Sequence, residues 1–474
     1  MTHRKARFLL DLWLDAAAPT NVPWLNPTVV KEVVDTGGFN LARGFSNFVR
    51  DVARNGGLPS QVDRKALALG RDLAATPGRV VLRNDLIELI AYEPQTESVF
   101  AQPIVYSPPW INKYYVLDLA PGRSFIEHAV GRGFTVFAIS YRNPDASMAD
   151  LTMDDYLRLG WLTAVDRAAE LTGAERVNVL GVCLGGTLTA IGLAVLAARG
   201  EAGRVGWATL VNALVDFSDP GDIGVFTDEA TVQKIERRTA RRGYLKPSEL
   251  SGPFTWMRAN DLVWRYVISG WYLGSRPPAF DILAWNDDAT RLPAAMHTQY
   301  LRSCYVENLL TRPGGFVADG MPVDIGAIKT PLYVLGAEND QRGRLVVVDV
   351  RRTRRQAVDA GKVAAVLLLR DPAGEFVDRL DHRAEARRED QPPRRATSRD
   401  LRCVGHPRDG CSTQKSVVTG VVYVAQESGR SRIACAFPVP RQRRPRVVAD
   451  IASTQEAAVQ SVARLGAHAP MQRA

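Results

Sequence analysis

The amino-acid sequence predicts an α/β fold, in which helices cover a mostly parallel β-sheet. From about residue 100 onwards, short apolar runs typical of strands alternate with segments whose apolar residues recur at helical spacing. The predicted strands are residues 102–107 (QPIVYS), 134–140 (FTVFAIS) and 177–182 (VNVLGV). Because a helical segment separates the second strand from the third, we expect these strands to be parallel.

The elements around these strands follow from local signals. Before the sheet, about 75 residues are expected to form a helical region, with helices over 29–34 and 41–52 that end at glycine pairs. Between the second and third strands, Thr152 and Asp155 predict a capping box at the start of a helix. One face of that helix carries the apolar residues Leu157, Trp161, Ala164, Val165 and Ala168.

The composition changes near residue 340. Residues 341–474 hold 26 Lys and Arg against 14 Asp and Glu, so their net charge is +12, whereas residues 1–340 have a net charge of −3. All nine Trp lie between Trp13 and Trp285. We therefore expect residues 1–75 to be a helical region, residues 76–340 a catalytic domain, and residues 341–474 an arginine-rich, disordered tail.

The cysteines indicate a reducing setting. Five cysteines in 474 residues give no disulfide framework, and none has the CxxC spacing of a zinc site. We expect a cytoplasmic protein without a bound metal. Arginine runs in the tail, such as 351–355 and 441–446, suggest nucleic-acid binding, but the tail lacks interleaved aromatic residues, so a solvated charged tail is the favoured interpretation.

The motif GVCLGG (181–186) lies between the third strand and an apolar helix that ends at Arg199 and Gly200. This is the pattern of a nucleophile elbow, in which glycines permit a sharp turn and the central residue is exposed above the strand. Cys183 is the predicted nucleophile, and the backbone N–H of Leu184 can face a developing oxyanion. The alternative is a small buried cysteine in a tight turn.

An elbow nucleophile needs an acid and a base further along the chain. The run TPLYVLGAEND (330–340) predicts a strand that ends beside two carboxylates, Glu338 and Asp340. Either could orient a base, or both could form a solvated turn. The later histidines, His382, His406 and His468, lie in arginine-rich sequence without a strand before them, so each fits an exposed histidine better than a catalytic base.

Residues 5–340 resemble the class I polyhydroxyalkanoate synthases, bacterial acyltransferases with an α/β-hydrolase fold. The resemblance rests on motifs in the family's order: SPPWINKYYVLDL (107–119), SYRNPDASM (140–148), VNVLGVCLGGT (177–187), DFSDPGDIGVF (216–226), NDLVWRYV (260–267), PPAFDILAWNDDATRLP (277–293) and YVLGAEND (333–340). Residues after Asp340 do not match the family pattern.

The resemblance implies roles for several residues. Cys183 would accept the acyl group, Asp340 would be the acid of the triad, and residues of about 215–293 would form a cap over the site. A second oxyanion donor would lie in the loop PPWIN, at Trp110 or Ile111, because Pro109 has no N–H. We take Ile111 as the candidate. Among the histidines, His406, which follows a glycine, is the first to consider as base.

The resemblance also implies the reaction and the partners. A cysteine takes an acyl group from a coenzyme A thioester as another thioester, which keeps the acyl carbon reactive towards the hydroxyl of a 3-hydroxyacyl unit. The product is a polyester, polyhydroxyalkanoate, and coenzyme A enters as part of the substrate, with no separate cofactor. The expected partners are (R)-3-hydroxyacyl-CoA, the growing chain, a second copy in a homodimer, and the surface of a polyester granule.

The departure from the family suggests two further interpretations. In the family, the aspartate is followed by histidine and isoleucine, and a later Gly-His-Ile segment supplies the base; here Gln341, Arg342 and Gly343 follow Asp340. The chain also begins later than most members do. One hypothesis is therefore an inactive product read out of frame after residue 340. The other is a thiol-nucleophile hydrolase, an esterase or thioesterase on the same fold, which the elbow alone would allow.

Overall fold

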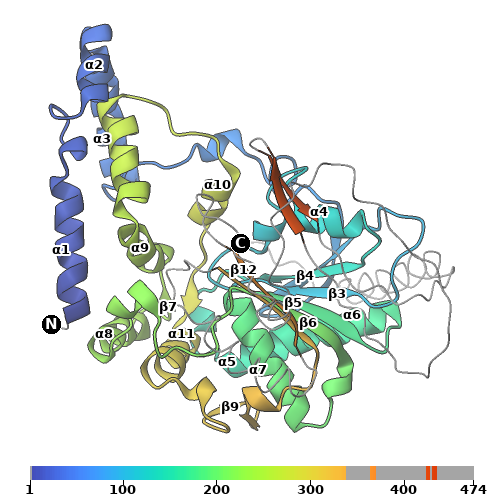
Figure 1. Cartoon of the computed structure of the whole chain (residues 1–474). Coiled ribbons are helices and arrows are strands. Elements are labelled where there is room, and N and C mark those ends of the chain that lie inside the picture. The colour runs from blue at the N-terminus through green and yellow to red at the C-terminus, as the bar shows by residue number, and fades with distance from the viewer. Residues whose placement is uncertain (1–2, 338–362, 370–422, 428–429, 435–474) are drawn as a thin grey trace, which may run out of the picture. The chain divides into compact units, whose positions relative to one another are not determined.

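The computed structural model describes residues 3–337, 363–369, 423–427 and 430–434 (Figure 1). Its centre is an eight-stranded sheet in the order β1-β2-β4-β3-β5-β6-β11-β12. The strands are β1 (Gly78–Arg83), β2 (Ile87–Tyr92), β3 (Ile104–Ser107), β4 (Val136–Tyr141), β5 (Val177–Val182), β6 (Val205–Val211), β11 (Leu332–Ala337) and β12 (Val363–Leu369).

The middle of the sheet is parallel, as predicted. Strand β3 pairs in parallel with β4 and β5, β5 pairs with β6, and β6 pairs with β11. Strands β1, β2 and β6 were not predicted from the sequence; β1 and β2 pair antiparallel, and β2 pairs antiparallel with β4. Because parallel neighbours share the same direction, the carboxyl ends of β3, β5, β6 and β11 meet at one edge of the sheet.

Helices cover the sheet, and the helical segment between β4 and β5 follows the predicted apolar periodicity. They are α4 (Phe125–Val130), α5 (Met153–Asp155), the π-helix η5 (Tyr156–Leu162), α6 (Thr163–Thr172) and α7 (Leu184–Ala198), with 3₁₀ turns η3 (Tyr114–Leu117), η4 (Ala146–Met148) and η6 (Ala202–Arg204). The predicted capping box is present, since the Thr152 N–H and hydroxyl both bond to Asp155 at 2.9 Å. All five apolar residues of the predicted helix face are buried.

The helical region before the sheet is also confirmed. It contains α1 (His3–Ala17), α2 (Pro27–Asp35) and α3 (Phe39–Arg54), with 3₁₀ turns η1 (Pro19–Asn21) and η2 (Arg64–Ala66). The side chain of Asn26 caps α2 by accepting bonds from the N–H groups of Thr28 and Val29, and Pro27 fits the first helical position because its missing N–H is not needed there.

A long insertion, residues 212–331, separates β6 from β11 and contains the predicted cap. Its helical elements are η7 (Gly221–Val225), α8 (Glu229–Ala240), α9 (Pro247–Met257), the π-helices η8 (Asn260–Trp264) and η9 (Val267–Tyr272), α10 (Asp281–Asp287), α11 (Ala294–Tyr300), the π-helix η10 (Leu301–Val306), η11 (Leu309–Thr311) and η12 (Ile325–Ala327). Its strands are β7 (Tyr244–Leu245), β8 (Leu292–Pro293), β9 (Phe316–Ala318) and β10 (Met321–Val323).

Three strands lie in the part of the chain where the sequence analysis expected a disordered tail. Strand β12, from the apolar run VAAVLLL, occupies the sheet edge next to β11. A separate unit contains the antiparallel hairpin of β13 (Tyr423–Glu427) and β14 (Arg430–Ala434). Apolar, aromatic and β-branched residues favour strand formation in β12 (VAAVLLL) and at the start of β13 (YVAQE).

Candidate active site

Cys183 occupies the turn between β5 and α7 with a backbone conformation that few residues adopt. Its φ is 53° and its ψ is −120°. Its N–H donates to the carbonyl of Val211 on β6 at 2.8 Å, and its own carbonyl accepts from Gly186 N–H at 2.9 Å. A non-glycine residue at positive φ is strained, and such strain is concentrated at functional sites. The predicted nucleophile-elbow geometry is therefore present, and the thiol is half-buried.

Two glycines of the motif are required by close contacts. A β-carbon at Gly181 would lie 2.6 Å from the hydroxyl oxygen of Thr189, and one at Gly186 would lie 2.5 Å from the β-carbon of Ala213. Separations under 3.0 Å are essentially never seen for real β-carbons. The glycines thus let α7 start directly against the end of β5, which brings its first N–H groups next to Cys183.

The two predicted oxyanion donors lie at the same edge of the sheet. Leu184 is the first residue of α7, and Ile111 follows β3, which pairs with β5 through Ser107 and Gly181. The loop that carries Ile111 is fixed from the insertion, because Thr290 donates from its hydroxyl to the carbonyl of Trp110 at 2.8 Å and from its N–H to the carbonyl of Ile111 at 3.3 Å.

An aromatic cluster belongs to the core cluster against which Cys183 packs. Trp110 makes edge-to-face contacts with Tyr156 and Tyr300, whose ring centroids lie 5.8 Å and 5.7 Å away. Phe217 and Tyr305 extend this cluster into the insertion. The cluster gives the site an apolar wall that would exclude water from a bound acyl chain.

Two buried tyrosines near Cys183 were not found by the sequence analysis. Burial raises the pKa of Tyr106 and of Tyr300 well above the ordinary value, and the nearby Cys183 adds to both shifts. Both hydroxyls are therefore protonated at neutral pH. Within the described part of the chain, the Tyr106 hydroxyl has no hydrogen-bond partner. The only signal for Tyr106 in the sequence is that a tyrosine lies within the apolar strand QPIVYS, and this does not indicate a functional residue.

The remaining predicted site residues lie outside the described residues. These are Glu338, Asp340, His382, His406 and His468. Strand β11 ends at Ala337, immediately before Glu338, and it is parallel to β6. The strand expected to lead to the acid is thus confirmed, and its carboxyl end lies at the same edge of the sheet as Cys183.

The described residues include one histidine in the core. His297 on α11 is 5% exposed, and burial lowers its pKa to about 4. Its Nδ1 atom has no hydrogen-bond partner among the described residues. In the same part of the chain, no cluster of three or more His, Cys, Asp or Glu side chains could hold a metal ion. None of the described helices combines the length and apolar character required to cross a membrane.

Two family models match this chain. Residues 1–129 match the N-terminus of poly-beta-hydroxybutyrate polymerase (PhaC), and residues 117–347 match the α/β-hydrolase fold. The second match confirms the predicted fold, in agreement with the sheet and the elbow.

Curated relatives carry the same family description. The chain is 42% identical over 344 residues to the poly(3-hydroxyalkanoate) polymerase subunit PhaC of Cupriavidus necator, covering 72% of this chain and 58% of that protein. It is 42% identical over 341 residues to the poly(3-hydroxyalkanoate) polymerase of Methylorubrum extorquens, covering 72% of this chain and 56% of that protein. The chain thus spans little more than half the length of these relatives.

Proposed function

Since this chain belongs to the polyhydroxyalkanoate polymerase family, we propose that the protein polymerises (R)-3-hydroxyacyl-CoA into polyhydroxyalkanoate through an acyl chain bound to Cys183. The observation that carries the proposal is the position of Cys183, in a strained strand-to-helix turn at the start of α7. The named relatives are poly(3-hydroxyalkanoate) polymerases, and the matched residues include this turn.

The proposed reaction has two transfers at one sulfur. The thiolate of Cys183 attacks the carbonyl carbon of the thioester, a tetrahedral oxyanion forms, and coenzyme A leaves as a thiol after taking up a proton. The hydroxyl of a second 3-hydroxyacyl unit then loses its proton to a base and attacks the acyl-cysteine, which forms an ester and releases Cys183. The N–H groups of Leu184 and Ile111 are the proposed oxyanion donors, and Asp340 is the proposed partner of the base.

The proposed base is a histidine, with His406 as the first candidate. Because the sequence after Asp340 departs from the family motif, we propose that this chain has little polymerising activity of its own. General base catalysis contributes about 10² to 10⁴-fold to such a step. A chain whose reading frame is restored after codon 340 should therefore polymerise faster than the present chain by about that factor.

The first experiment incubates the full chain with 3-hydroxybutyryl-CoA and follows coenzyme A release and the mass of the peptide that contains Cys183. We expect an acyl adduct on Cys183, no adduct in Cys183→Ala, and an unchanged adduct in Cys304→Ala, since Cys304, in the insertion, is a fully buried thiol that a substrate cannot reach. Full coenzyme A release by Cys183→Ala would contradict the proposal. Release of free 3-hydroxy acid in place of polyester would show a hydrolase.

We further propose that the protein is cytoplasmic, acts at the surface of its insoluble product and forms a homodimer. Exposed large apolar side chains on α1 to α3 support association with an apolar surface, as in helices that bind interfaces through Trp, Phe and Leu. They include Leu9, Leu10, Trp13, Leu14, Val34, Phe39 and Phe45. Trp13→Glu should reduce co-sedimentation with polyester particles, and light scattering of the purified chain should give the mass of two copies.

A further inference from the structure

The helical region before the sheet bonds repeatedly to the insertion between β6 and β11. Near its start, Lys5 forms an ion pair with Asp228, the N-cap of α8, at 2.6 Å. Further along, Asn260 of η8 donates to the carboxylate of Asp15 at 2.6 Å, and Gln61 donates to the carbonyl of Leu262 at 2.6 Å. These partners are more than 200 positions apart in sequence, so the N-terminal region lies along the insertion (Figure 1).

Helix α3 faces the insertion with its polar side. Asn40, Gly44, Asn47 and Asp51 recur at spacings of four, three and four residues, so they share one face of the helix. Asn40, Gly44 and Asp51 are buried. Large apolar residues of the same helix are exposed, namely Phe39, Leu41, Phe45, Phe48, Val49 and Val52. The polarity of α3 is therefore the reverse of that of a helix packed on an apolar core.

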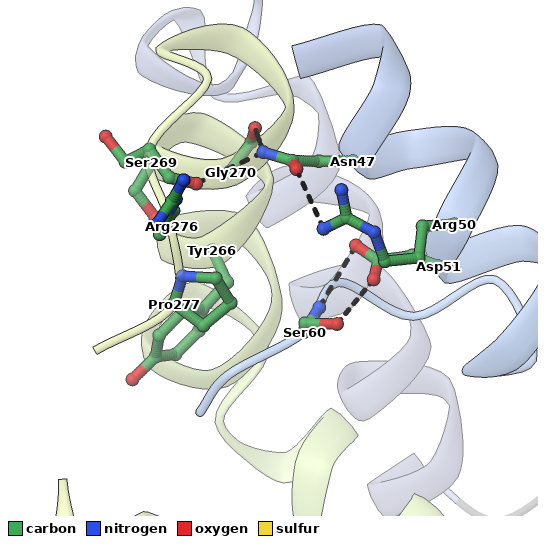
Figure 2. Close-up of a pocket in the computed structure, with 10 residues that line it drawn as sticks. Asn47, Arg50, Asp51, Ser60, Tyr266, Ser269, Gly270, Arg276 and Pro277 are labelled. Atoms are coloured by element: carbon green, nitrogen blue, oxygen red, sulfur yellow. Dashed lines mark hydrogen bonds between the residues drawn. The ribbon is translucent and has the colours of Figure 1, made fainter. Parts of the chain in front are cut away.

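The polar face satisfies carbonyl groups at the end of the π-helix η9. The last carbonyls of a helix have no partner within the helix and need one elsewhere. Asn40 donates its side-chain amide to the carbonyl of Tyr272 at 2.8 Å. Asn47 donates to the carbonyls of Gly270 at 2.9 Å and Ser275 at 3.1 Å (Figure 2). Two amide groups of α3 thus cap η9 and the turn that follows it.

Two glycines permit this close approach. A β-carbon at Gly44 would overlap the carbonyl oxygen of Trp271 and lie 2.7 Å from its carbonyl carbon. A β-carbon at Gly274, whose φ is 66°, would lie 2.6 Å from the carbonyl oxygen of Asn40 and 2.8 Å from the β-carbon of Arg43. Each backbone therefore occupies the space that a side chain on the other would need.

Asp51 completes the contact with a carboxylate that accepts three hydrogen bonds. Its Oδ2 accepts from the indole N–H of Trp271 at 2.8 Å and from the N–H of Ser60 at 3.1 Å. The Ser60 hydroxyl donates to Oδ1 (Figure 2). Asp51 is 4% exposed. Because three donors surround a buried carboxylate, this contact joins α3, the following loop and η9 at one point.

The segment held by α3 continues to the loop that carries the proposed oxyanion donor. After η9, the chain passes through α10, where the indole N–H of Trp285 donates to the carbonyl of Lys113 at 2.8 Å. Thr290 then donates to the carbonyls of Trp110 and Ile111. Hydrogen bonds therefore connect α3 to η9, and the chain after η9 to the loop beside the nucleophile.

We propose that α3 is a brace for the insertion and that Asn40, Asn47 and Asp51 are positioning residues, which hold η9 so that the segment following it keeps the 108–113 loop in place beside Cys183. The catalytic meaning of this inference rests on the proposed function. The physical coupling does not, because it concerns the order of η9 and of residues 285–293 and can be measured without substrate.

The test compares Asp51→Leu with Asp51→Asn in the full chain. Leucine has a similar size but accepts no hydrogen bond, whereas asparagine keeps an acceptor oxygen for Trp271 and an amide for Ser60. Hydrogen exchange of residues 267–276 and 285–293 should become about tenfold faster or more in Asp51→Leu, since buried donors lose their partner, and should stay near the wild-type rate in Asp51→Asn. A thiol reagent should also modify Cys183 faster in Asp51→Leu than in the wild type, and at about the wild-type rate in Asp51→Asn.

A second pair of variants, in which a less disruptive substitution is compared with its control, tests the proposal if Asp51→Leu does not fold. Asn47→Ala removes both amide bonds to residues 270 and 275, and Ser46→Ala, at an exposed neighbouring position, is its control. Faster exchange of residues 267–276 and 285–293 in Asn47→Ala alone would support the brace. Faster exchange confined to α3, or equal effects of Asp51→Leu and Asp51→Asn, would overturn it. If the variants show the expected differences in hydrogen exchange but the wild-type chain releases no coenzyme A, only the proposed function is contradicted.

Discussion

Gly185 in the first turn of α7 packs directly against the backbone of Ser107, at the end of β3. A β-carbon at position 185 would overlap the Ser107 carbonyl oxygen and lie 2.5 Å from the carbonyl oxygen of Pro108. Both neighbours are backbone atoms, which cannot move aside as a flexible side chain would. This contact joins the helix that begins after Cys183, the proposed nucleophile, to the loop that carries the proposed oxyanion donor Ile111.

The first prediction concerns this contact. Gly185→Ala should lower the free energy of unfolding by about 3 kcal/mol or more, at the upper end of the range for overpacked sites, and should slow acylation of Cys183 because the elbow must shift. Urea unfolding and the rate of adduct formation measure the two effects. Gly203→Ala is the control, since nothing lies within 4 Å of a β-carbon there. Equal stability of the two variants would show that the α7 start is not constrained by Ser107.

The second prediction concerns the hydroxyl of Thr189, which links α7 to the π-helix η5. Thr189 is fully buried, donates to the carbonyl of Gly185 at 2.7 Å and accepts from the indole N–H of Trp161 at 3.1 Å. Thr189→Val keeps the shape but leaves that N–H without an acceptor, so the free energy of unfolding should fall by about 1–3 kcal/mol.

Thermal or urea unfolding checks this prediction against a matched variant. Thr172 is half-buried, and its hydroxyl donates to the carbonyl of Ala168 within its own helix. Thr172→Val should therefore cost clearly less than Thr189→Val. If both substitutions lower the free energy of unfolding by the same amount, the hydrogen bond from Trp161 to Thr189 adds nothing to stability.

The third prediction is a pH dependence caused by His297. Its pKa is about 4 in the folded protein because burial disfavours the charged ring, and about 6.5 in an unfolded chain. Between these values the unfolded chain binds the proton and the folded protein does not. Stability is therefore fully present above pH 6.5 and is lost as the pH falls towards 4, by up to about 1.4 kcal/mol per pH unit.

Unfolding curves of the wild type and His297→Gln between pH 4 and 8 measure this contribution. The difference in free energy of unfolding between the two proteins should be constant above pH 7 and should shrink as the pH falls, because glutamine does not titrate. A difference that stays constant down to pH 4.5 would mean that His297 is not buried in its neutral form.

The sequence predicts strands β3, β4, β5 and β11, the capping box at Thr152 and the elbow at Cys183 because each depends on local signals, but it does not predict β6. It does not predict the π-helices, since their hydrogen bonds leave the apolar spacing close to that of an α-helix. The edge strand β1 is not predicted either, because its residues do not alternate between buried and exposed positions.

Helix α3 shows a different limit of sequence reasoning. The apolar spacing of residues 41–52 correctly predicts a helix. It does not reveal that this side is exposed while Asn40, Gly44 and Asp51 are buried, because that depends on carbonyl groups of η9 about 230 positions away. For the candidate site, the elbow geometry at Cys183 could be predicted from its motif, whereas the neighbouring Tyr106 and Tyr300 are identified only by their position in space.

The last prediction separates structure from function at Tyr106. Its fully buried hydroxyl has no partner among the described residues, so the desolvation of that group is not compensated in the folded protein. Tyr106→Phe should therefore leave the free energy of unfolding unchanged or raise it by about 1 kcal/mol. Tyr115→Phe is the matched control, because the buried Tyr115 hydroxyl donates to Asp288 at 2.9 Å, and its loss should destabilise the protein by about 1–3 kcal/mol.

If the Tyr106 hydroxyl helps to hold the acyl group at Cys183, Tyr106→Phe should also slow acylation about tenfold while the protein stays fully folded. A destabilised Tyr106→Phe would mean that the hydroxyl already has a partner, and an unchanged acylation rate would show that it serves neither the fold nor the reaction.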